Sequence, residues 1–113
     1  MVRTAKQRTE LLRGTLELLI LRTLELQPLH GIAIADRIRQ VTNHTFDVGA
    51  GSLFPALHRL EQEGRIRGAW TTSAEGRRVK AYALTPEGRR KLTAEKRQWQ
   101  RIVTAMTQVL EMP

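Results

Sequence analysis

The chain has 113 residues, no cysteine and a net charge of +8. This length allows one domain with a modest core, and the lack of cysteine excludes a disulfide framework and thiolate chemistry. The apolar run Leu18–Leu21 is far shorter than a membrane span, and residues 1–10 lack the apolar segment of a signal peptide. We therefore expect a cytoplasmic protein with no membrane contact, and the basic charge suggests a polyanionic partner.

The excess positive charge is concentrated in one part of the chain. Residues 65–101 contain eleven Lys or Arg and three Asp or Glu, whereas residues 1–64 contain eight and seven. A basic patch on one part of a small domain is what phosphate contacts require. The alternative is a solvated basic surface that binds nothing.

Residues 1–9 are expected to form a flexible basic arm. The first helix is predicted from about Thr9 to Leu26, where Gln27-Pro28 ends it because the residue before proline avoids the α region. Its leucines and isoleucine cover two sides rather than one stripe. Because a domain this small offers one core, the second side suggests a partner subunit, with Leu16 and Ile20 in the interface.

A second helix is predicted from Gly31 to about Val41, and its apolar face contains Ile34, Ile38 and Val41. Asp47 follows this helix and is expected to cap the next one, because a carboxylate accepts hydrogen bonds from the first N–H groups of a helix.

The stretch from Phe46 to Gly64 is typical of a recognition helix. Leu53, Leu57 and Leu60 fall at i, i+4 and i+7 and form an apolar face, and Gly64 indicates the helix stop. The other faces hold small or polar residues that a large surface could approach closely, namely Gly51, Ser52, Pro55, Ala56 and Arg59. We predict that residues 52–64 lie in a DNA major groove. The alternative is an ordinary core helix of a small α+β domain.

Pro55 conflicts with a regular helix, because it lacks a backbone donor and crowds the carbonyl of Gly51. Either a first turn over Gly49–Leu53 joins the main segment at a kink, or the regular helix starts with Pro55 near its first position. Both alternatives leave N–H groups near Gly51 and Ser52 that suit a phosphate.

A basic hairpin is predicted next, with strands Ile66–Thr71 and Val79–Leu84. Gly76 supplies the turn in the polar connection between them. Arg77 and Arg78 close this connection, and Lys80 projects from the returning strand. With the preceding helix, this wing completes the predicted DNA contacts: Gly51, Ser52, Pro55, Arg59, Arg77, Arg78 and Lys80.

A long last helix is predicted from Pro86 to about Glu111, because Thr85-Pro86-Glu87 combines a capping hydroxyl, a first-turn proline and an acid. Its apolar residues have near-heptad spacing, which favours pairing with a second copy. The predicted dimer contacts are Leu16, Ile20, Trp99, Ile102, Met106 and Val109. The chain then divides into the arm (1–9), a DNA-binding domain (10–85) and a dimerisation helix (86–113).

The stretches HGIAIADRI, GSLFPALHRLEQEGRI, TTSAEGRRVKAYALTPEG and KRQWQRI, taken in this order, resemble the PadR family of transcriptional regulators. The resemblance covers Leu12 to Leu110 and is closest to the short subfamily with a single C-terminal dimerisation helix. It implies an α+β, mostly α, winged helix-turn-helix protein that acts as a homodimeric repressor on double-stranded DNA. Phe54 stands where the family usually has a tyrosine, so a phosphate contact through that hydroxyl is not expected.

The resemblance also suggests an effector. In multidrug-responsive members a tryptophan at a place similar to Trp99 faces its symmetry mate and stacks on flat aromatic compounds. The alternative is that Trp99 only packs in the dimer. A ligand-independent DNA-binding protein and an RNA- or protein-binding module also remain open. An enzyme is not expected, because the sequence has no nucleophile or phosphate-loop motif and its histidines lack metal-ligand spacing. No cofactor or metal is predicted.

Overall fold

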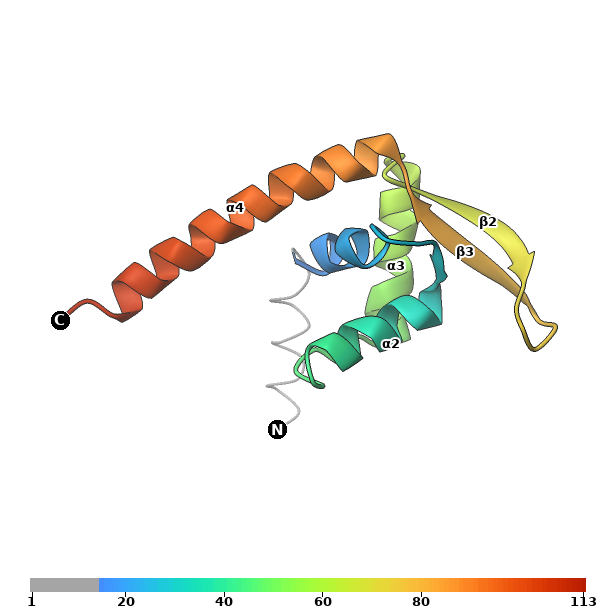
Figure 1. Cartoon of the computed structure of the whole chain (residues 1–113), viewed down its shortest axis with the longest axis horizontal. Helices are drawn as coiled ribbons and strands as arrows, with labels where there is room; N and C mark the ends of the chain where they lie inside the picture. The colour runs from blue at the N-terminus through green and yellow to red at the C-terminus, as the bar shows by residue number, and fades with distance from the viewer. Residues whose placement is uncertain (1–14) are drawn as a thin grey trace.

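The chain forms several helices and one small antiparallel sheet, whose first strand precedes two of the helices and whose other two strands follow them (Figure 1). The computed structural model describes residues 15–113, so the predicted arm at residues 1–9 lies outside the described residues. The N-terminal helix is described over residues 15–23. The other elements are β1 (Leu29–His30), α2 (Gly31–Val41), α3 (Ala50–Gln62), β2 (Ile66–Thr72), β3 (Arg78–Leu84) and α4 (Pro86–Leu110). The fold is α+β and mostly helical, as predicted.

The three-stranded sheet has the order β1-β3-β2. β2 and β3 form the predicted hairpin, in a register that pairs Ile66 with Leu84 and Thr72 with Arg78. The sequence did not predict β1, because two residues are too few to show the alternation of a strand. β1 pairs Leu29 with Tyr82, and Tyr82 is consequently buried at the base of the hairpin.

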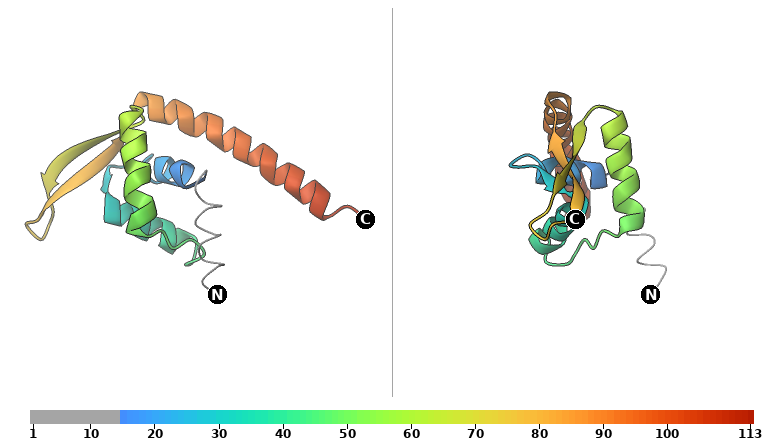
Figure 2. Two further views of the ribbon diagram at one scale, coloured as in Figure 1. Left: turned by 180° about the vertical axis from the view of Figure 1, so that it is seen from behind. Right: turned by 90° about the vertical axis from the view of Figure 1, so that its right-hand side faces the viewer.

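The core lies where the N-terminal helix, α2, α3 and the base of the hairpin meet, and α4 and the wing leave this body in opposite directions (Figure 2). Its residues are Leu16, Ile20, Leu21, Leu24, Ile34, Ile38, Leu53, Ala56, Leu57, Leu60, Ile66, Tyr82 and Leu92. The placement of Leu16 and Ile20 at a dimer interface therefore needs correction. They are 4% and 0% exposed, and side chains enclosed by their own chain have no surface left for a partner.

The N-terminal helix ends earlier than predicted. Its last regular residue is 23, after which the N–H of Glu25 bonds to the carbonyl of Arg22 in a tighter turn. Leu26 is exposed, whereas Leu24 still reaches the core. The early end lets the chain turn at Pro28 and bring β1 against β3.

The bounds of α2 agree with the prediction. The Nδ1 atom of His30 caps the helix by accepting a hydrogen bond of 3.3 Å from the N–H of Ala33. Asn43 and His44 end this segment with positive φ angles of 51° and 66°, a conformation that asparagine and histidine tolerate better than most residues. Val41, predicted to face inward, is exposed because it is the last residue of the helix.

α3 begins at Ala50 and includes Pro55, so the helix starts before the proline, as in the first of the two alternatives. The cap position is Gly49, which has no side chain to accept a hydrogen bond. The prediction that Asp47 caps this helix is wrong, because its carboxylate instead faces Arg39 of α2 at 3.9 Å. The helix stops at Gln62, and Gly64 then adopts a φ angle of +73°.

α4 begins as predicted at Thr85-Pro86-Glu87. The hydroxyl of Thr85 accepts a hydrogen bond from the N–H of Gly88 at 3.0 Å and donates one to the carbonyl of Gly64 at 2.6 Å. A Cβ on Gly88 would overlap the carbonyl oxygen of Arg65, so only glycine allows this close packing. In the part of the chain that the structure describes, no helix is long and apolar enough to cross a membrane.

Candidate nucleic-acid interface

The outward face of α3 is formed by residues that no other element covers. Leu53, Ala56, Leu57 and Leu60 turn into the core. Gly51, Pro55, His58 and Gln62 recur at i, i+4, i+7 and i+11 and are all exposed. Ala56, predicted among the approachable residues of this helix, is instead buried. Gly51 and Pro55 were predicted at this face, whereas His58 and Gln62 were not. Their spacing from Gly51 is the signal that could have found them.

The N-terminus of α3 is open to an external acceptor. Ser52 and Leu53 donate their N–H groups to the carbonyl of Gly49, at 3.1 and 2.9 Å. Within residues 15–113, the N–H groups of Ala50 and Gly51 have no such partner. A Cβ added at Gly51 would meet nothing within 4 Å, so a phosphate could approach this backbone directly.

Phe54 lies beside this site but turns toward α2. Its ring is so close to Gly31 that a Cβ there would come within 2.9 Å of ring atom Cε1. The ring therefore helps to hold the start of α2 against α3 and has no hydroxyl to offer to a phosphate.

Both charged residues in the middle of α3 are engaged by other elements. Arg59 Nε lies 2.9 Å from Glu17 Oε2 on the N-terminal helix, and Glu61 Oε1 lies 2.9 Å from Lys80 Nζ on β3. The hydrogen bond from Lys80 to Glu61 is the main reason that the pKa of Lys80 is raised above its usual 10.5. Arg59 and Lys80, predicted as DNA contacts, thus already have carboxylate partners.

The tip of the wing is a tight, basic turn. The N–H of Ser73 bonds to the carbonyl of Arg77 at 2.7 Å, and Gly76 closes the turn with a φ angle of +81°. Arg77 is exposed, and the guanidinium carbon of Arg78 lies 5.2 Å from the centre of the Trp70 ring. In the described residues neither arginine forms a salt bridge. The predicted contacts Gly51, Ser52, Pro55, Arg77 and Arg78 therefore remain accessible on α3 and the wing.

A helix with an open N-terminus, followed by a hairpin with a basic tip, defines the winged helix-turn-helix class of DNA-binding proteins. Residues 20–94 match the Transcriptional regulator PadR-like family, and the chain belongs to this family. The members of this family are transcriptional regulators and not enzymes, so DNA-binding regulation is the activity to be explained.

Solved structures and a curated relative agree with this assignment. The chain is 32% identical to a PadR family transcription regulator from Clostridium difficile R20291, with a TM-score of 0.74 over 83% of this chain and 96% of that one. It is 26% identical to a PadR-like transcriptional regulator from Bacillus cereus ATCC 14579, with a TM-score of 0.79 over 92% and 99%. The transcriptional regulator Rv3488 of Mycobacterium tuberculosis is 36% identical over 59 residues, which are 52% of this chain and 54% of that protein.

Proposed function

We propose that the chain acts in the cytoplasm as a homodimeric repressor that places α3 in a DNA major groove and the wing along the phosphate backbone. One observation carries this proposal: one face of α3 is left uncovered, and the same molecule has a wing tip whose arginines are exposed. Two protomers would present two such helices to half-sites one turn of DNA apart.

In this proposal, different groups supply the affinity for DNA and the recognition of its sequence. Because Arg59 and Glu61 of α3 are paired with other elements, affinity comes mainly from the wing and from backbone N–H groups. Ser52, His58 and Gln62 then supply fit and a few base contacts, since hydroxyl, imidazole and amide groups can bond to base edges.

Dimerisation is proposed along α4. Gly88 and Leu92 of this helix are buried against the body, and the same helical face continues outward with exposed apolar side chains. These are Trp99, Ile102, Val103, Met106, Val109 and Leu110. Their near-heptad spacing is that of a helix that pairs with another helix, and a contiguous apolar strip of this kind marks an interaction surface. A second copy of α4 is the occupant we propose.

We expect Arg77→Ala combined with Arg78→Ala to weaken binding similarly on all duplex sequences. Each lost phosphate contact removes one released counterion, so the slope of log affinity against log salt should flatten by about one to two. Fluorescence anisotropy on duplexes captured from source genomic DNA, with RNA as competitor, measures both quantities.

Arg97→Ala combined with Arg101→Ala is the matched control, because it removes the same charge from exposed positions on α4. An unchanged slope in the wing variant would contradict the wing assignment. Binding that the RNA competitor removes as readily as unlabelled duplex does would contradict DNA as the partner.

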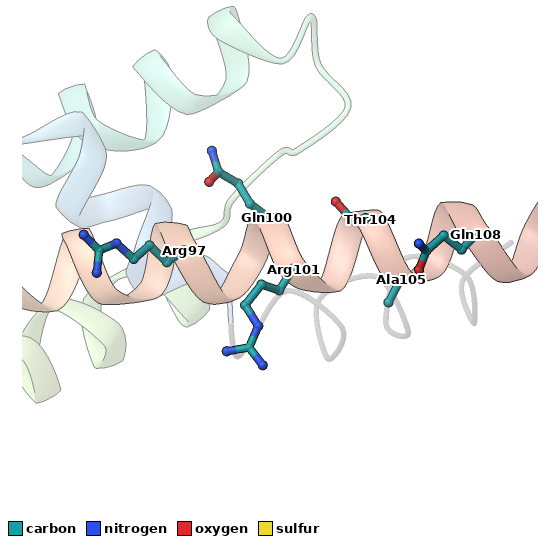
Figure 3. Close-up of a pocket in the computed structure, with 6 residues that line it drawn as sticks. All are labelled: Arg97, Gln100, Arg101, Thr104, Ala105 and Gln108. Atoms are coloured by element: carbon teal, nitrogen blue, oxygen red, sulfur yellow. The ribbon is translucent and has the colours of Figure 1, made fainter.

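We also propose that a small planar aromatic effector releases the repressor by stacking on Trp99 and its symmetry mate. Trp99 is 44% exposed on the apolar face of α4, and two indole rings would offer flat surfaces to a guest. A groove of about 470 Å³ on α4 is not this site (Figure 3). It is lined by Arg97, Gln100, Arg101, Thr104, Ala105 and Gln108, which include no aromatic ring and none of the exposed apolar residues of α4 named above.

In a Trp70→Phe variant, Trp99 is the only tryptophan, and we expect planar aromatic cations or phenolic acids to quench its fluorescence and to release the DNA. Stacking of a guest on an indole changes its emission directly, which a remote binding site would not do. Trp99→Leu is the control and should bind DNA without responding to the compounds. If no compound quenches Trp99 or releases DNA, the residue serves in dimer packing alone.

A further inference from the structure

The carboxylate of Glu61 joins the recognition helix to both strands of the wing. Its Oε1 atom lies 2.9 Å from Lys80 Nζ on β3, and its Oε2 atom accepts a hydrogen bond of 3.3 Å from the N–H of Gly68 on β2. The Glu61 and Lys80 side chains are both 31% exposed, so water screens the pair only in part. One side chain thus links three elements that contribute to the proposed DNA surface.

The strand surface holds Lys80 in this orientation. A Cβ on Gly68 would overlap Cε of Lys80, so the lysine stem occupies the space that the missing side chain leaves. The ammonium group also lies 5.6 Å from the centre of the Tyr82 ring, where the negative face of the ring attracts a cation. Lys80 is therefore directed toward α3, whereas Arg77 and Arg78 at the tip form no salt bridge within the described residues.

We propose that Glu61 determines specificity by keeping Lys80 away from DNA phosphates and by fixing the wing relative to α3. This inference rests on the proposed contact of α3 and the wing with DNA. A lysine or arginine that contacts DNA phosphates strengthens binding to every sequence alike. A lysine held by an internal carboxylate makes no such contact and so adds nothing to non-specific binding. Recognition then depends more on the fit of α3. The role is one of positioning, because Glu61 acts through Lys80.

Glu61→Gln tests this role, because glutamine can still accept the Gly68 hydrogen bond but no longer holds the lysine by charge. We expect binding to a non-specific duplex to tighten about 3- to 10-fold and the salt slope to steepen by about one. Binding to the specific site should tighten less, so the specificity ratio falls.

Glu63→Gln is the matched control. It removes the same charge at the end of the same helix, but Glu63 pairs with Arg65 and not with the wing. In this control, non-specific affinity should change less than about twofold, and the salt slope should stay the same.

Lys80→Gln shows whether Lys80 is kept away from the DNA phosphates or already contacts them in the wild type. In the wild-type background this substitution should leave the salt slope unchanged, and in the Glu61→Gln background it should remove the gain in non-specific binding. A flatter slope for Lys80→Gln alone would show that Lys80 already contacts phosphate and would overturn the inference. Equal behaviour of Glu61→Gln and Glu63→Gln would overturn it as well. Neither result would affect the proposed function, whose test is whether the wild type binds duplex DNA in preference to RNA.

Discussion

Ser52→Glu should abolish DNA binding while the chain remains folded. Ser52 is the third residue of α3, next to the open N–H groups where we propose that a phosphate binds. A carboxylate at this place would face that phosphate, and like-charge contacts at an interface cost several kcal/mol, so affinity should fall about 100-fold or more. The helix itself should tolerate the change, because an acid in the first turn interacts favourably with the helix dipole. Anisotropy with operator DNA and a thermal melt measure the two effects separately.

Ser52→Gln provides the control, since its side chain has a similar size and no charge. It should keep much more affinity than Ser52→Glu if repulsion is the cause. Retained affinity in Ser52→Glu, with the fold intact, would mean that α3 does not face DNA and that another surface of the chain has to be sought.

Local rules predict much of this fold. Thr85 and Pro86 mark the start of α4, Gly64 marks the end of α3, and Gly76 marks the turn of the wing, because each signal acts within a few residues of the chain. The alternation of side chains places both long strands to within one residue of their observed ends. Such signals need no knowledge of what packs against the element.

Features that depend on contacts between distant residues could not be predicted from the sequence. Apolar residues on two sides of the first helix suggested a partner subunit, but the chain itself covers Leu16 and Ile20, and periodicity cannot tell an internal neighbour from an external one.

The candidate DNA interface shows the same limit of prediction from sequence. The type of each basic residue identifies it as a candidate DNA contact, but only the fold shows which cations are already paired. The ion pair of Arg59 with Glu17 spans 42 positions in the sequence, and that of Lys80 with Glu61 spans 19. No spacing rule connects such pairs. The arginines at the wing tip, by contrast, could be recognised from Gly76 alone, because a tight turn leaves its neighbours exposed.

Met106→Asp should convert the proposed dimer to a monomer and remove specific DNA binding. Met106 lies in the middle of the exposed apolar face of α4 and is 54% exposed in the single chain. The protomer should therefore fold normally, whereas a dimer would have to bury an unpaired carboxylate in an apolar interface. Without the dimer, each half-site is bound separately, and affinity for a two-half-site operator should fall about 100-fold or more. Sedimentation velocity and anisotropy measure the two losses.

Thr104→Asp adds the same charge two positions earlier, roughly 200° around the helix from Met106, and should remain dimeric with its DNA affinity largely preserved. If both variants dissociate, added charge anywhere on α4 disrupts the assembly and the apolar face has no special role. If Met106→Asp stays dimeric, the interface lies elsewhere on the chain. A wild-type chain that sediments as a monomer at micromolar concentration would contradict the homodimer itself, because the apolar face of α4 would then remain in water without a partner.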